Sequence, residues 1–251
     1  MIKNISVVII ANNAEKTLPN TLNSLKEFSE VIVYENNSTD NTKQIAKSFT
    51  NVTLIEGDFL GFGKTKNKAI SYATNEWILS LDSDEVLSDE FIKNLKSITL
   101  NHNCIYEIHR INFYKNNQIK YCWKDDFIIR LFNKTKTSFT NKDVHEKIIK
   151  NNFDIVRLQG YVLHYPYSSI EQFINKANTY STLFAKNNVG KKSSSPTKAF
   201  FNATYSFFRT YIIKQGFRDG YVGLLIAVSH AMTNFYKYLK LYELNKELKT
   251  S

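Results

Sequence analysis

Short apolar segments alternate with amphipathic segments along the first 82 residues. Ile5 to Ala11 is a continuous run of mostly β-branched residues, which is typical of a strand buried on both faces. Three further strands are predicted at residues 31–35, 52–55 and 77–81, with helices between the strands at about 15–28, 39–49 and 64–73. This order favours a parallel sheet flanked by helices, in which ligands bind beyond the carboxyl ends of the strands.

The pattern changes after residue 100. A helix is predicted from Ser88 to about Thr99, and the segments that follow resemble short strands, at 105–113, 119–122, 127–132, 153–158 and 162–165. From Ser169 onward the chain is predicted to be helical, at about 169–188, 196–214 and 219–241. We therefore expect a mixed, mostly parallel α/β domain over residues 1–168 and a helical extension over 169–251.

An acidic segment follows the fourth predicted strand directly. It reads Asp82-Ser83-Asp84-Glu85, and alternate residues at a strand end project to the same side. Asp82 and Asp84 can therefore share one divalent cation, and their oxygen ligands suit Mg²⁺ or Mn²⁺. The alternative is an acidic cap for the helix that begins near Phe91.

Two further polar segments lie where a nucleotide could bind. Residues 35–40 (ENNSTD) follow the second strand, and their side chains can bind a base or ribose or can form a turn with a helix cap. Residues 61–67 (GFGKTKN) are a near match to a phosphate-binding P-loop, but Asp58 stands where that loop needs glycine. The segment also follows the third strand and not the first. Lysines at such a helix start still suit a diphosphate.

A later acidic segment, Asp143-Val144-His145-Glu146, offers a general base. Glu146 is the candidate, and Asp143 is the alternative. A surface turn or a histidine in the core would explain the same residues. The five histidines show no zinc-binding spacing, which argues against a zinc enzyme.

Composition and charge distinguish the two halves. The chain is 43% hydrophobic and 22% charged, as in globular proteins, and its two cysteines cannot build a disulfide framework. Residues 1–100 carry 10 basic and 13 acidic residues, whereas residues 101–251 carry 23 and 10. Residues 186–251 interleave aromatic side chains with 11 basic residues, which favours contact with an anionic membrane surface. Helices packed on the sheet, or an oligomer contact, are the alternatives.

No run of 18 apolar residues occurs, so no membrane-spanning helix is predicted. No basic and apolar leader opens the chain, which favours a cytoplasmic protein.

Taken together, residues 5–146 resemble the family 2 glycosyltransferases, which have the GT-A fold. The resemblance is carried, in order, by ISVVIIANNAEKTL, VIVYENNSTDNT, GFGKTKNKAI and WILSLDSDE. IIRLFN, DVHEKI, the segment from His164 to Tyr167 and the basic aromatic tail are similar to the branch that adds a hexose, often β-glucose, to the inner core of lipopolysaccharide or lipooligosaccharide. The Q-x-x-R-W motif of processive members is absent after residue 150, so addition of a single sugar is expected.

The resemblance implies inverting, metal-dependent transfer from a UDP-sugar to a lipid-linked saccharide. It implies that Glu35 contacts the uracil or ribose, that Asp84 and Asp82 hold the metal, and that Glu146 is the base. The nucleotide-sugar site would comprise Ala11, Asn13, Glu35, Lys66, Asn67 and Asp82. Ala11, Glu35 and Asn37 depart from the threonine, aspartate and glycine that are common at these positions.

The implied partners are the UDP-sugar donor, the lipid-linked acceptor and the anionic inner face of the cytoplasmic membrane. No nucleic-acid partner is expected. A nucleotidyltransferase is one alternative, but residues 11–14 lack the arginine- and glycine-rich loop that such enzymes usually have. The second alternative is a non-catalytic module that binds membrane or nucleic acid. This alternative does not explain the acidic pair Asp82 and Asp84.

Overall fold

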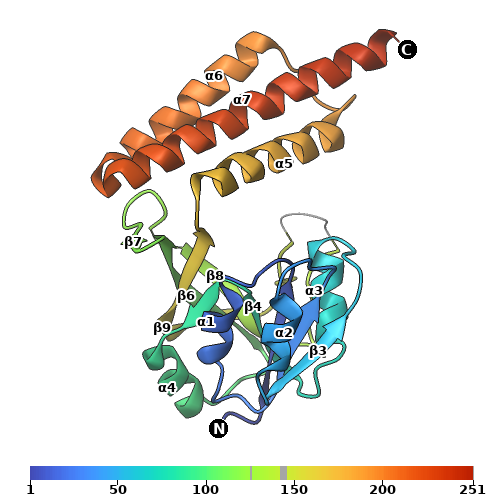
Figure 1. Cartoon of the computed structure of the whole chain (residues 1–251), viewed down its shortest axis with the longest axis vertical. Helices are drawn as coiled ribbons and strands as arrows, with labels where there is room; N and C mark the ends of the chain where they lie inside the picture. Colours follow the sequence, from blue (N-terminus) through green and yellow to red (C-terminus); the bar gives the residue numbers. More distant parts are fainter. Residues whose placement is uncertain (125, 142–145, 251) are drawn as a thin grey trace. The chain divides into compact units, whose positions relative to one another are not determined.

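The computed structural model describes residues 1–124, 126–141 and 146–250. The chain forms two compact units. Figure 1 shows the whole chain, with its helices and strands labelled. The first unit comprises residues 1–111 and 125–165, and the second comprises 112–124 and 166–251. The domain boundary at residue 168 stays a prediction. The compact units divide three residues earlier and group residues 112–124 with the helices.

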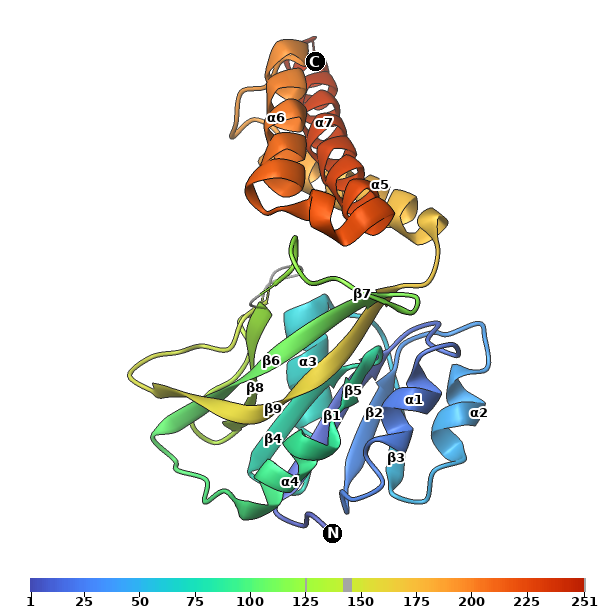
Figure 2. The same cartoon turned by 90° about the vertical axis from the view of Figure 1, so that its left-hand side faces the viewer.

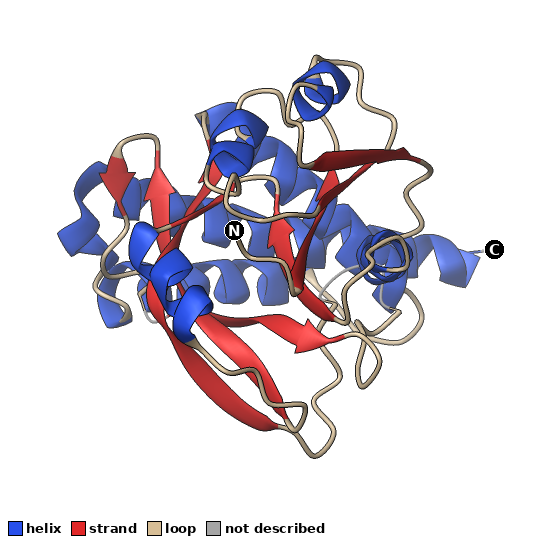
Figure 3. Ribbon diagram, turned by 90° about the horizontal axis from the view of Figure 1, so that it is seen from below, coloured by secondary structure: helices blue, strands red, loops and turns tan. Residues whose placement is uncertain are grey.

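The first unit is built on a mixed sheet, whose strands are red in Figure 3. The strand order is β3-β2-β1-β4-β8-β6-β9-β5, and β7 pairs with β6. The strands are β1 (Ile5–Ala11), β2 (Val31–Glu35), β3 (Val52–Glu56), β4 (Trp77–Asp82), β5 (Glu85–Leu87), β6 (Cys104–Tyr114), β7 (Asn117–Gln118), β8 (Asp126–Asn133) and β9 (Asp154–Tyr167).

The parallel part of the sheet is β3-β2-β1-β4, and β8 then pairs with β4 in the antiparallel direction. The strand order reverses between β1 and β4, because the chain builds outward from β1 first on one side and then on the other. Such a switch point leaves a crevice outside the carboxyl ends of the two strands, where ligands of α/β sheets bind. The mixed α/β fold is confirmed.

Helices cover both faces of the sheet, as Figure 2 shows. On one face lie α1 (Leu18–Asn23), α2 (Thr42–Lys47) and α4 (Asp89–Ser97), and on the other lies α3 (Phe62–Ile70). Alternate residues of β1 divide between the two hydrophobic cores: Val7 and Ile9 pack toward α1, and Val8 packs toward α3. This alternation explains why β1 reads as one continuous apolar run.

The prediction of two strands at 153–158 and 162–165 is wrong, because they form the single strand β9. Gly160 lies between them with φ +85°. A Cβ at this position would come within 2.4 Å of the backbone nitrogen of Phe91. The glycine therefore allows β9 to pass close to α4 and does not end the strand.

The second unit contains α5 (Ile170–Asn188), α6 (Pro196–Phe208) and α7 (Gly220–Thr250), and α7 packs against the other two. A π-helical turn (Arg209–Ile213) continues α6, and a 3₁₀ turn (Gly216–Asp219) precedes α7. Within the described ranges, no helix has both the length and the apolar composition needed to cross a membrane.

Residues 119–122, predicted as a strand, form a loop instead. The carboxylate of Asp219 accepts hydrogen bonds from the backbone N–H groups of Lys120 (2.8 Å), Tyr121 (3.0 Å) and Cys122 (2.9 Å). A side chain therefore satisfies the donors that a neighbouring strand would otherwise have bound. The apolar pattern of the segment could not distinguish these two outcomes.

Candidate active site

The acidic turn lies at the switch point of the sheet. Asp82 ends β4 beside Ile10 of β1, and Glu85 begins β5. Glu85 is fully buried, and its Oε2 accepts the backbone N–H of Asp82 at 3.0 Å. Glu85 therefore closes the turn that presents Asp82 and Asp84 at the carboxyl edge. The sequence suggested no such role for Glu85.

Two arginines neutralise the buried acids of this turn. Arg130 of β8 donates to Glu85 at 2.7 Å and also to Asp82. Arg110 of β6 donates to Glu85 at 3.1 Å. Burial alone would raise the pKa of Asp82, but Arg130 and Lys66 outweigh it and hold that pKa well below its usual value. Asp82 is therefore ionised at neutral pH.

Lys66 connects the acidic turn to the candidate base. It lies on α3 and is only 4% exposed. Its Nζ is 3.0 Å from Asp82 Oδ1 and 2.9 Å from Glu146 Oε1. The structure thus brings Lys66, Asp82 and Glu146 together from three separate parts of the chain. Asp143, the alternative base, lies outside the described residues.

The side chain of Asn67 is hydrogen-bonded to the backbone of Phe139. Its side-chain amide donates to the carbonyl of Phe139 at 2.9 Å, and its Oδ1 accepts the N–H of the same residue at 3.0 Å. This double contact fixes α3 to the segment that leads toward Glu146. The geometry therefore favours a positioning role for Asn67, and its predicted contact with a nucleotide remains a prediction.

Asp84 faces His164, for which no sequence pattern indicated a metal-ligating role. Asp84 Oδ1 is 3.7 Å from His164 Nε2, and the pairing of β5 with β9 places His164 opposite Glu85. The carboxylate of Asp84 suits Mg²⁺ or Mn²⁺, and the imidazole of His164 favours Mn²⁺ over the harder Mg²⁺. The described residues contain no group of three or more ligating side chains, so a bound cation would need diphosphate oxygens and water as further ligands.

The loops that follow β1 and β2 are hydrogen-bonded to each other at the carboxyl edge of the sheet. Ala11 pairs with Glu35, and Asn13 binds the second loop by accepting the N–H of Thr39 at 2.8 Å. Glu35 is 1% exposed, its Oε1 accepts the N–H of Ser38, and its Oε2 lies 3.4 Å from Lys43 Nζ. The structure places Ala11, Asn13 and Glu35 at the predicted edge, and their contacts with a nucleotide remain predictions.

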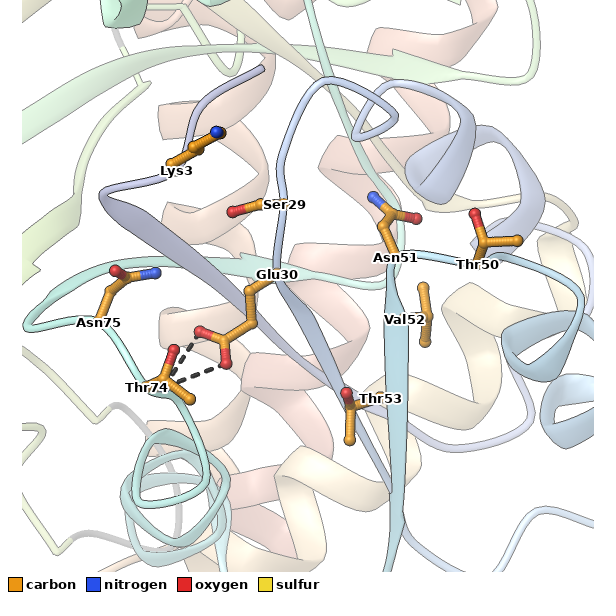
Figure 4. Close-up of a pocket in the computed structure, with 9 residues that line it drawn as sticks. All are labelled: Lys3, Ser29, Glu30, Thr50, Asn51, Val52, Thr53, Thr74 and Asn75. Atoms are coloured by element: carbon orange, nitrogen blue, oxygen red, sulfur yellow. Dashed lines mark hydrogen bonds between the residues drawn. The ribbon is translucent and has the colours of Figure 1, made fainter.

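A pocket of about 340 Å³ lies at the opposite edge of the sheet, between the segments that precede β1, β2, β3 and β4. Figure 4 shows its polar lining, in which Glu30 binds Thr74. Glu30 accepts the N–H of Thr74 through both carboxylate oxygens, at 3.0 and 3.1 Å. Because the candidate site residues lie at the carboxyl edge, this pocket is separate from them.

A second pocket, of about 470 Å³, lies near the acidic turn. Asn20 and Asn23 of α1, Val86 of β5 and Tyr165 of β9 contribute to its lining. Tyr165 also donates its backbone N–H to the carbonyl of Asp84 at 3.0 Å. Tyr165 therefore links the pocket lining to the backbone of Asp84, and Asp84 itself does not line the pocket.

The mixed sheet, its flanking helices and the acidic turn at the switch point define a GT-A glycosyltransferase fold. The model of the family "Glycosyl transferase family 2" matches residues 6–157. The chain belongs to this family and is a glycosyltransferase. This assignment decides against a non-catalytic module.

Relatives of known sequence support the assignment. The chain is 34% identical to an "uncharacterized glycosyltransferase" of Rickettsia typhi, over 97% of this chain and 88% of the relative. It is 33% identical to the poly(ribitol-phosphate) β-N-acetylglucosaminyltransferase TarS of Staphylococcus aureus, over 39% of this chain and 19% of TarS.

Solved structures agree in fold. S. aureus TarS in complex with UDP-GlcNAc matches with a TM-score of 0.51 at 15% identity, covering 98% of this chain and 92% of that chain. The complex with UDP matches with a TM-score of 0.50 at 17% identity, covering 98% and 91%.

Proposed function

We propose that the protein transfers one hexose from a UDP-sugar to a saccharide carried on a lipid, with inversion at the anomeric carbon. The observation that carries the proposal is the position of Lys66 Nζ, 3.0 Å from Asp82 and 2.9 Å from Glu146. It joins the candidate base to the acidic turn at the edge where α/β sheets bind nucleotides. The UDP and UDP-GlcNAc complexes of TarS support the choice of donor.

The chemistry assigned to Glu146 is removal of the proton from the acceptor hydroxyl. The hydroxyl oxygen then bonds to the anomeric carbon, while the bond from that carbon to the diphosphate breaks on the opposite face. UDP leaves with the bonding electrons, so the product has the inverted configuration. Lys66 orients Glu146 and keeps its carboxylate directed toward Asp82.

Asp84 and His164 are the residues that would hold the divalent cation. A bound Mg²⁺ or Mn²⁺ would offset the charge that develops on the leaving diphosphate. Asp82 has a different role in this arrangement, because both of its oxygens already contact cationic side chains, Lys66 and Arg130. We therefore assign Asp82 to orientation of the turn and of the donor.

The pocket of about 470 Å³ that Tyr165 helps to line supports a saccharide acceptor. The amides of Asn20 and Asn23, which line it, can exchange hydrogen bonds with hydroxyl groups. The resemblance to the lipooligosaccharide branch favours a core saccharide on the cytoplasmic face of the membrane, and glucose as the transferred sugar. The family assignment favours this function over nucleotidyl transfer.

The first test is release of UDP from UDP-glucose, UDP-galactose and UDP-GlcNAc, with Mn²⁺, Mg²⁺ or EDTA. We expect one sugar to be preferred and EDTA to abolish turnover. We also expect Asp84→Asn and His164→Ala to weaken the binding of Mn²⁺ with UDP in a calorimetric titration. Full activity in EDTA would refute the requirement for a divalent metal. Failure to release UDP from every UDP-sugar would refute the assignment of a UDP-sugar as the donor.

The second test addresses the acceptor. Mass spectrometry of cell-surface glycolipid, with and without the gene, is expected to show the loss of one hexose. NMR of the product made in vitro is expected to show the anomeric configuration opposite to that of the donor. Unchanged glycolipid would refute the lipid-linked acceptor, and a retained configuration would refute inversion.

A further inference from the structure

The exposed side of α6 is apolar. Ala199 and Thr210 are buried against the rest of the helical unit. The opposite side, which a surface helix normally fills with polar residues, carries large apolar side chains at helical spacing. Their exposed fractions are 65% for Phe201, 60% for Tyr205, 50% for Phe208 and 45% for Ile212, and Phe200 beside them is 60% exposed.

Phe201, Tyr205, Phe208 and Ile212 are called the α6 stripe below. The charged side chains next to it are cationic. Arg209 and Lys214 flank its carboxyl end, are exposed, and have no side-chain hydrogen bond or ion pair within the described residues. Asp219 is the only acidic residue between positions 190 and 242. Its carboxylate is turned inward, because it binds three backbone N–H groups of the 120–122 loop. The exposed charges between positions 190 and 242 are therefore all cationic, and the exposed carboxylates of α7, Glu243 and Glu247, lie beyond this range.

We infer that this stripe of α6 docks on an anionic phospholipid bilayer. Phe201, Tyr205 and Phe208 would enter the interfacial region of the lipid, and Arg209 and Lys214 would contact the headgroups. Aromatic side chains beside cations are the composition that favours this interface, and the single-signed charge complements an anionic leaflet. The inference rests on the proposed lipid-linked acceptor for its biological purpose, but its test contains no sugar.

The structure also changes which basic residues a test should use. Five lysines stand out in the sequence of the tail: Lys191, Lys192, Lys198, Lys237 and Lys240. Lys240 donates to Asn178, Ser181 and Thr182 of α5, and Lys237 lies over the rings of Phe184 and Tyr238. Reversing these charges would disturb helix packing, so Arg209 and Lys214 are the cleaner pair.

The experiment is co-sedimentation of the full chain with vesicles of phosphatidylglycerol and phosphatidylcholine, compared with phosphatidylcholine alone. One variant combines Phe201→Gln, Tyr205→Gln and Phe208→Gln, and another combines Arg209→Gln with Lys214→Gln. Control variants replace exposed apolar or basic side chains of the other unit by glutamine: Ile155→Gln with Val156→Gln, and Lys47→Gln with Lys93→Gln. All nine of these positions are exposed, so circular dichroism is expected to stay native.

The wild type is expected to bind the anionic vesicles and hardly the neutral ones. Removing the two charges should lower the partition coefficient about 30-fold at low salt. Removing the three aromatic rings should lower the binding that persists at high salt at least about tenfold, because salt screens only the charges. The controls should bind like the wild type.

Three results would overturn the inference. They are no binding of the wild type to anionic vesicles, equal binding of the aromatic variant, and a dimer in analytical ultracentrifugation that the aromatic variant dissociates without a change in vesicle binding. The last result would assign the stripe to a second copy of the chain. UDP release is measured on the same proteins, so failure of membrane docking is distinguished from failure of the proposed transfer.

Discussion

Replacing Glu146 by glutamine separates catalysis from folding at the candidate site. Glutamine has nearly the same shape as glutamate, and its side-chain oxygen can still accept the hydrogen bond from Lys66 that is 2.9 Å long in the wild type. It cannot accept a proton from an acceptor hydroxyl at neutral pH. The substitution therefore removes the proposed base and preserves the contact that holds the segment.

The structure sets the expected sizes of the two effects. Loss of a general base lowers kcat by about 10² to 10⁴, which raises the barrier by roughly 3 to 5 kcal/mol. The contact with Lys66 changes from a charged to a neutral hydrogen bond, and Lys66 keeps its bond to Asp82. The free energy of unfolding should therefore fall by only about 1 kcal/mol.

The assay is UDP release at saturating donor, with thermal unfolding measured on the same samples. Glu107→Gln is the matched control, because Glu107 is also partly buried and forms an ion pair of 2.9 Å, with Arg157. A kcat for Glu146→Gln within threefold of the wild type would refute the role of the base. A raised KM for the donor with unchanged kcat would instead assign Glu146 to donor binding.

Three further predictions concern stability. Glu85→Gln should lower the free energy of unfolding by at least about 2 kcal/mol in urea titrations, because the buried Arg130 loses a charged partner; an unchanged midpoint would contradict this. Gly160→Ala should cost at least about 2 kcal/mol by the same measurement, because its Cβ would lie 2.4 Å from the nitrogen of Phe91 at φ +85°; Ser138→Ala, away from this crossing, serves as the comparison. Burial lowers the pKa of His230 from 6.5 to about 4, so the unfolded chain binds the proton more tightly. Stability is then full above about pH 6.5 and about 2 kcal/mol lower at pH 5, and an equal loss in His230→Gln would show that other groups cause it.

The acidic turn and the parallel half of the sheet could be predicted because the signals are local. Strand β1 is buried on both faces and therefore reads as an apolar run, and Asp82 follows the equally apolar β4 directly. The predicted strand at 31–35 agrees with β2 residue for residue. The short strand β5 was not predicted, because three residues are too few to show a periodicity.

Only the tertiary structure paired the residues of the candidate site. Lys66 was predicted to lie near a nucleotide, which stays a prediction, and the structure shows that it bridges Asp82 and Glu146. His164 reaches Asp84 because β9 pairs with β5, a contact between segments about 80 positions apart in the sequence. No spacing rule covers such a distance, since ion pairs form between whichever side chains the packed elements bring within reach.

The sequence by itself determined the class of the fold, the acidic turn after the fourth strand and the basic, aromatic character of the tail. These follow from residue types and short periods that each segment carries alone. The tertiary structure decided which side of α6 is covered, that Asp219 is turned inward, and that Lys240 is bound to α5. The physical reason is that burial and charge pairing depend on neighbours that the chain supplies only after it has folded.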